Sequence, residues 1–253
     1  NKRKRFILVS LILALGLAGT QLVQLNQRYA AIAVLTLIST ALSAWALFSD
    51  LKGIGWLTVL TLPVMYPTSV ALFYFLLPAN FLARGLLLIL FAFGMYALLL
   101  TENIYSVAAI RTIQLVRAAH AVGFLLTILT SIFFIGTIFS LRLFFWTNGL
   151  AVALVLFPLL LQGCWSVILS VRLSFLVVRR SLILAIIGGG IATVSSFLPM
   201  NPIVAALLVS GYLYVVMGLS QQEFQERLFK RTIQEYVAVG IIVLLAAIIV
   251  TYY

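Results

Sequence analysis

Long apolar runs, each close to the length of one membrane crossing, follow one another along the chain. A helix that crosses a bilayer needs about 20 predominantly apolar residues. Two longer polar stretches, 102–119 and 221–235, interrupt the runs. The pattern predicts nine spans, at 6–25, 28–48, 54–78, 82–101, 120–141, 147–171, 181–199, 202–220 and 236–253.

The runs are continuous and do not alternate in short segments, which excludes a membrane β-barrel. Helices remain, because lipid offers the backbone no hydrogen-bond partners. Composition agrees, since 64% of the 253 residues are hydrophobic and 8% are charged, whereas a soluble domain carries about 25% charged residues. We therefore predict an all-α polytopic integral membrane protein. We expect residues 6–25, after the basic start NKRKR, to be a retained anchor.

Lysine and arginine residues give the orientation. With a cytoplasmic N-terminus, only Arg28, Arg84 and Arg142 of the 16 cations fall on the opposite side, which leaves 16 − 3 = 13 inside. This positive-inside bias predicts a plasma membrane of the bacterial type, with the C-terminus on the opposite side. The expected partners are membrane lipids, whose anionic headgroups contact the cytoplasmic face. Nucleic acid is not expected, and a protein partner stays open.

Three sequence features recur about 120 positions apart. RTIQ stands at 111–114 and at 231–234, Trp45 precedes Trp165 by 120, and LPAN at 77–80 precedes LPMN at 198–201 by 121. These matches predict a tandem duplication, with one four-helix repeat over 1–120, a second over 121–235 and a ninth helix at 236–253. Because each repeat has an even number of spans, the two repeats are parallel, related by a pseudo-two-fold axis along the membrane normal.

The duplication assigns structural roles to paired residues. Pro78 and Pro199 should stop the third helix of each repeat, and Asn80 and Asn201 should cap the fourth. Trp45 and Trp165 should lie at similar depth near the cytoplasmic interface. The polar stretches 102–119 and 221–235 read as interfacial helices, on which Arg111 and Arg231 hold equivalent places. These two arginines either reach lipid phosphates or dock each linker on its own repeat.

Candidate catalytic chemistry is sparse. His120 is the sole histidine and Cys164 the sole cysteine, so a multi-histidine metal site is excluded, and we expect no cofactor. Glu102 and His120 flank the first linker, where they are candidates for acid–base work, with Arg117 holding a phosphate. The alternative is structural, with Glu102 in the first turn of a helix. The balance favours a protein that is not an enzyme.

The third span of each repeat carries helix-weakening residues near its middle. Pro63 and Pro67 lie in one, and three consecutive glycines, Gly188, Gly189 and Gly190, lie in the other. Broken helices at matching midplane positions favour a binding site, whereas the alternative is that the glycines only allow close packing. The candidate ligand-binding residues are Tyr66, Thr68, Ser69, Gly188, Gly189, Gly190 and Thr193.

These features leave three hypotheses about function. The first is that the protein, without catalysis, binds or passes a small neutral or lipid-like molecule between two pseudo-symmetric halves. The second is a membrane-embedded lipid-modifying enzyme that acts at the cytoplasmic face through Glu102, Arg117 and His120. The third is a membrane scaffold subunit. The sequence favours the first, because it offers weakened helices and few catalytic groups.

Overall fold

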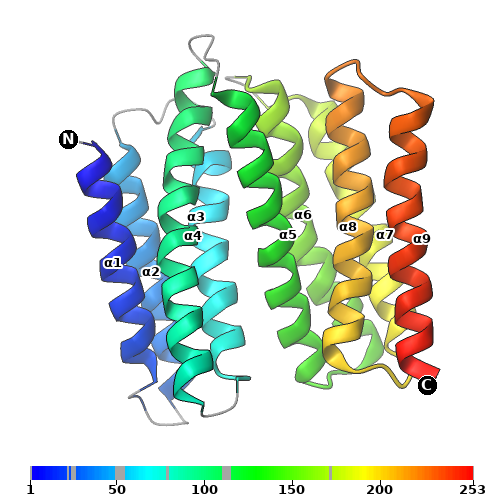
Figure 1. The fold of residues 1–253 in the computed structure, drawn as a ribbon, viewed down its shortest axis with the longest axis horizontal. Helices are drawn as coiled ribbons and strands as arrows, with labels where there is room; N and C mark the ends of the chain where they lie inside the picture. Colours follow the sequence, from blue (N-terminus) through cyan, green and yellow to red (C-terminus); the bar gives the residue numbers. More distant parts are fainter. Residues whose placement is uncertain are drawn as a thin grey trace. The chain divides into compact units, whose positions relative to one another are not determined.

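A computed structural model describes residues 2–21, 23, 27–48, 55–77, 80–109, 115–170 and 173–252. Nine α-helices and no strand occupy these described residues (Figure 1). The helices are α1 (Lys2–Thr20), α2 (Arg28–Leu47), α3 (Gly55–Tyr74), α4 (Phe81–Ala108), α5 (Val116–Ser140), α6 (Phe145–Ile168), α7 (Phe175–Ser195), α8 (Pro202–Phe224) and α9 (Lys230–Tyr252). The predicted fold class, an all-helical polytopic membrane protein, is confirmed.

Eight of the described helices, α2 to α9, are long and apolar enough to cross a membrane. The exception among the nine predicted spans is the first. Helix α1 begins with four cations and ends at Thr20 rather than at residue 25. Its apolar part, 6–20, is therefore about 22 Å long, which is shorter than the hydrocarbon core of about 30 Å.

The two polar stretches do not form separate interfacial helices in the described part of the chain. Residues 102–108 continue α4, which reaches 28 residues, and 221–224 continue α8. Residues 116–119 and 230–235 are the first turns of α5 and α9. The prediction was wrong because an amphipathic pattern also describes a spanning helix that projects beyond the bilayer, and α4 is about 42 Å long.

The chain folds as two compact units, residues 1–130 and 131–253, and the boundary falls within α5. In unit 1, α1 packs on α2 and α4, and α3 also packs on α2 and α4. In unit 2, α6 packs on α7 and α8, and α9 packs on α8. Helix α5 contributes to both units. The Tyr105 hydroxyl donates to the carbonyl of Ala119 at 2.9 Å in unit 1, and Ser131 bonds Ser210 at 2.9 Å in unit 2.

Each unit has an apolar interior at helical spacing. Helix α1 buries Phe6, Val9, Leu13 and Leu17 although its opposite face is exposed. Such a stripe, at intervals of three and four residues, is one helix face turned toward neighbouring helices. Helix α9 is the reverse case, because Ala247 is its one buried apolar residue among those described. Its remaining surface suits contact with lipid.

Candidate functional site

The polar candidates of unit 1 pack inside the helix bundle. Tyr66 is buried and stacks on Phe91 with ring centroids 5.5 Å apart. The Thr68 hydroxyl donates to the carbonyl of Val64 at 2.7 Å and lies 2.8 Å from the Thr36 hydroxyl of α2. The Ser69 hydroxyl donates to the carbonyl of Tyr66 at 2.8 Å. In this arrangement the hydroxyls of Thr68 and Ser69 bond to backbone and to a neighbouring helix.

Helix α3 continues through both of its prolines. Pro67 has no N–H to offer, so the carbonyl of Pro63 loses its partner within the helix. Ser39 of α2 donates to that carbonyl at 2.7 Å, and Ser39 is fully buried. A hydroxyl from a neighbouring helix therefore satisfies the freed backbone group, as a proline inside a membrane helix requires. The donor, Ser39, was not among the residues that the sequence singled out.

The three glycines of α7 have different surroundings. A Cβ added to Gly189 would lie 2.6 Å from the carbonyl oxygen of Gly149 and 2.9 Å from the Cβ of Ala153. One added to Gly188 would lie 3.0 Å from the ring of Tyr212 and would also meet Leu156. Both glycines therefore allow α7 to pack closely, on α6 and on α8. A Cβ at Gly190 would meet nothing within 4 Å.

Thr193, the last candidate of this group, belongs to the same contact between helices. Its hydroxyl donates to the carbonyl of Gly189 at 2.9 Å, and its side chain lies against Gly149 of α6. Of the three glycines of α7, Gly190 is the one with open space beside it. It lines an apolar groove.

This α7–α9 groove lies between α7, α8 and α9 and has a volume of about 670 Å³. That volume is within the range of about 300–1,000 Å³ that ligand sites usually have. Tyr212 and Ser195 are its described hydroxyl-bearing lining residues, and both donate to α7 carbonyls, Leu184 at 2.8 Å and Ile191 at 2.8 Å. The groove surface is thus apolar. Its lining residues are Ile187, Gly190, Ile191, Val194, Ser195, Leu198, Met200, Leu208, Tyr212, Val215, Gly240, Leu244, Ala247 and Ile248.

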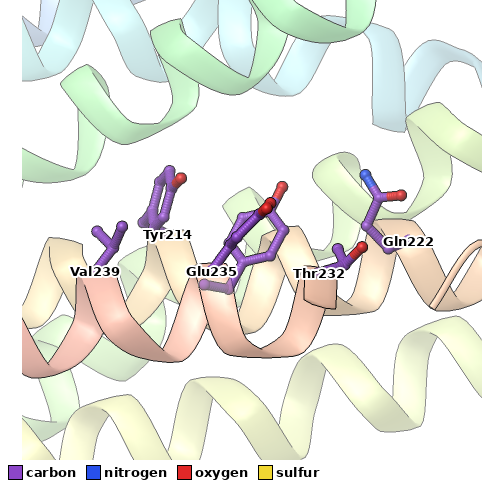
Figure 2. Close-up of a pocket in the computed structure, with 6 residues that line it drawn as sticks. Tyr214, Gln222, Thr232, Glu235 and Val239 are labelled. Carbon is purple, nitrogen blue, oxygen red and sulfur yellow. The ribbon is translucent and has the colours of Figure 1, made fainter. Parts of the chain in front are cut away.

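A second, polar pocket lies toward the turn between α8 and α9. This α8–α9 pocket, of about 340 Å³, is lined by Tyr214, Gln222, Thr232, Glu235, Tyr236 and Val239. Figure 2 shows Tyr214 and Gln222 on α8, and Thr232 and Val239 on α9, with their side chains directed toward the same side. The Tyr214 and Tyr236 rings lie 5.3 Å apart at 46°, and Glu235 accepts from Arg231 at 3.1 Å.

The candidate catalytic residues lie around Tyr105. Glu102 is fully buried on α4, one turn before Tyr105. The His120 ring lies 5.6 Å from the Tyr105 ring, and Arg117 is exposed. No group of three histidine, cysteine, aspartate or glutamate side chains suited to a metal ion occurs in the described part of the chain.

The paired residues of the predicted duplication differ in their surroundings. The side chains of Asn80 and Asn201 accept from the backbone N–H two residues on, at 3.0 and 3.1 Å. Both predicted caps are confirmed. Trp45 is 50% exposed beneath the Arg5 guanidinium, whereas Trp165 is 2% exposed and donates to the carbonyl of Ser170 at 3.0 Å.

The remaining members of these pairs are less informative. Pro199 follows the end of α7 as expected, since α7 ends at Ser195. Arg231 pairs with Glu235 in the first turns of α9. Pro78 and Arg111, with the rest of the first RTIQ, lie outside the described residues.

No protein-family model, curated protein or solved structure matches this chain. The function is therefore argued from the groove and the pocket themselves. Sequence reasoning found Gly190 but missed Tyr214, Gln222, Glu235 and Tyr236. The one available signal was Glu235, an acid placed directly after the second RTIQ in a chain with five acids.

Proposed function

We propose that this protein binds a lipid-like molecule in the α7–α9 groove and does so without catalysis. The observation that carries the proposal is the apolar groove of about 670 Å³ beside Gly190, within a helix bundle of membrane-spanning character. The bilayer supplies ligands of matching chemistry at high local concentration. An apolar surface with internally bonded hydroxyls favours a hydrocarbon chain over a polar solute.

The position of the groove along the helices supports a ligand from one leaflet. Most of its lining residues come from the second half of α7, the first half of α8 and the second half of α9, and Val215 and Gly240 lie near the middle of their helices. Most of the groove therefore lies toward the turn between α7 and α8, which the charge distribution predicts to be on the side opposite the cytoplasm. The proposed ligand therefore enters sideways from the outer leaflet.

The test is photolabelling of the full chain reconstituted in nanodiscs with a phospholipid that carries a diazirine on its acyl chain. The expected result is preferential labelling of peptides that contain 187–200 and 240–248. Gly190→Leu fills the open space beside the helix and should remove most of this labelling. Gly85→Leu is the matched control, because a Cβ at Gly85 of α4 also meets nothing within 4 Å.

The control separates a specific site from general lipid contact. Labelling spread evenly over the lipid-facing helices, or equal labelling of the Gly190→Leu and Gly85→Leu variants, would overturn the proposal. Loss of lipid at the groove in Gly190→Leu alone would support it. Circular dichroism of both variants establishes that each retains its helix content.

A further inference from the structure

The α8–α9 pocket differs in chemistry from the apolar groove. Two phenols, an amide, a hydroxyl and one carboxylate line its volume of about 340 Å³ (Figure 2). Of the described residues that line it, Glu235 alone carries a charge. We propose that this pocket binds an organic ammonium group of the size of ethanolamine or choline. This inference does not depend on the apolar groove.

The two tyrosine rings give the pocket an aromatic corner. Tyr214 of α8 and Tyr236 of α9 have centroids 5.3 Å apart and planes inclined at 46°. The face of an aromatic ring attracts a cation within about 6 Å, and aromatic cages of this kind bind methylated ammonium groups. Because both rings line the same pocket, both can contact one bound cation.

Gly218 holds the Tyr236 ring in place. A Cβ added to Gly218 would lie 2.6 Å and 2.8 Å from atoms of that ring, so the ring rests directly on the α8 backbone. The Tyr236 ring is therefore packed against α8 at the wall of the pocket. A binding surface that is ordered before the ligand arrives loses less entropy when the ligand binds.

Glu235 supplies the charge that an ammonium ion requires. Its partner Arg231 lies 3.1 Å away on the same helix, and the two side chains are 89% and 65% exposed. Exposed ion pairs of this kind contribute little, so a cation inside the pocket can compete for the carboxylate. An anion would be repelled by the carboxylate and by the negative faces of the two rings.

A bare metal ion fits the pocket less well than an organic cation. Calcium takes six to eight oxygen ligands, several of them carboxylates, and the described lining residues include one carboxylate. The site also differs from its counterpart in the first half of the chain. Positions 120 residues before Tyr214 and Tyr236 hold Gly94 and Val116, so the aromatic corner is a property of unit 2.

The ammonium group has two sources with the same chemistry, a lipid headgroup or a soluble amine. Gln222 is near the end of α8 and Thr232 is in the first turn of α9. The pocket thus lies at the end of two spanning helices, where headgroups lie and where water reaches. The experiment has one arm for each source.

The first arm uses the full chain in phosphatidylglycerol nanodiscs, which contain no ammonium lipid. Calorimetry measures the binding of tetramethylammonium chloride and of ethanolamine hydrochloride, with sodium chloride as the ionic control. The second arm uses nanodiscs with equal phosphatidylethanolamine and phosphatidylglycerol. Native mass spectrometry then identifies the lipid that the protein retains.

Four variants assign the result to the pocket. Glu235→Gln and Tyr236→Leu should each weaken ammonium binding by about ten-fold or more, and Val239→Phe should block the pocket without altering a polar group. Glu226→Gln removes the same charge from an exposed site outside the pocket and should leave binding unchanged.

Each outcome decides the proposal. Preference for tetramethylammonium or ethanolamine over sodium supports a soluble ligand, and selective retention of phosphatidylethanolamine supports a headgroup. Either preference must weaken in Glu235→Gln and Val239→Phe, so the inference survives even if Tyr236→Leu fails to fold. Equal behaviour of sodium and the organic cations together with no lipid preference, or equal effects of Glu235→Gln and Glu226→Gln, would overturn it.

Discussion

Pro67 leaves the carbonyl of Pro63 without its helical partner, and a single hydroxyl from the next helix compensates. The Ser39 hydroxyl makes this bond at 2.7 Å in a fully buried position. We expect Ser39→Ala to lower the free energy of unfolding by about 1 kcal/mol, since hydrogen bonds between membrane helices average about 0.6 kcal/mol and reach about 1.7 kcal/mol. Unfolding in mixed detergent micelles, followed by circular dichroism, measures the change.

A second substitution tests the cause at the same scale. Pro67→Ala restores an N–H that bonds the carbonyl of Pro63, so in that background Ser39→Ala should cost close to nothing. If Ser39→Ala lowered the free energy of unfolding equally in the wild-type and Pro67→Ala proteins, the Ser39 hydrogen bond would not be a replacement for the missing N–H of Pro67. A proline inside a membrane helix requires a donor for the carbonyl that it frees, but the sequence does not show that Ser39 is that donor. Which residue of α2 lies beside the Pro63 carbonyl depends on which faces of α2 and α3 pack together, and that is determined by tertiary packing.

At the scale of one helix, α7 has two adjacent glycines with opposite surroundings. A Cβ at Gly189 would lie 2.6 Å from the Gly149 carbonyl oxygen, whereas one at Gly190 would meet nothing within 4 Å. Gly189→Ala should therefore destabilise the protein by about 1–3 kcal/mol, the usual cost of overpacking. Gly190→Ala should leave stability unchanged or raise it by up to about 1 kcal/mol, because alanine favours helix.

The same unfolding measurement compares the two alanine variants directly. Equal destabilisation would mean that glycine matters to α7 through backbone conformation rather than through contact with α6. The glycine triplet could be found in the sequence, but its division into two packing positions and one groove position could not. One residue is 100° of helix rotation, and three successive glycines give no sign of which face meets a neighbour.

The sequence was sufficient to predict that the helices form, but less sufficient to predict where each helix ends. Each long apolar run became a helix because lipid leaves the backbone no other partner. The caps Asn80 and Asn201 were also predictable, since an asparagine after a proline marks a helix start. The end of α4 was not, because Glu102 looks like the polar end of a span in the sequence yet is buried inside unit 1.

At the scale of the whole molecule, helix starts recur close to the proposed spacing of 120. Helix α3 begins at Gly55 and α7 at Phe175, which is 175 − 55 = 120 positions later, and α2 and α6 begin at Arg28 and Phe145, which is 145 − 28 = 117 positions apart. This correspondence supports the tandem duplication that we propose. Both candidate sites nevertheless belong to unit 2 alone, and α9 contributes to both. We infer that duplication produced the framework and that the added helix created the sites.

Helix α1 decides whether the chain crosses the membrane eight or nine times. Its apolar part is about 22 Å long, yet it packs along α2 and α4 through Phe6, Leu13 and Leu17. A helix held alongside two spanning helices should cross with them, because its cations can extend to the headgroups. We therefore propose nine crossings with a cytoplasmic N-terminus.

Single cysteines test this topology. In a Cys164→Ser background, Arg3→Cys, Met200→Cys and Arg227→Cys place one thiol at the N-terminus, in the α7–α8 turn and in the α8–α9 turn. A maleimide that cannot cross membranes should label Met200→Cys in intact cells, and Arg3→Cys and Arg227→Cys only after permeabilisation. Labelling of both Arg3→Cys and Met200→Cys in intact cells would mean eight crossings. In that case α1 does not cross the membrane, and the N-terminus lies on the same side as the start of α2. Labelling of Arg227→Cys in intact cells, and of Met200→Cys only after permeabilisation, would mean that the orientation is opposite to the one proposed. The α7–α9 groove would then face the inner leaflet.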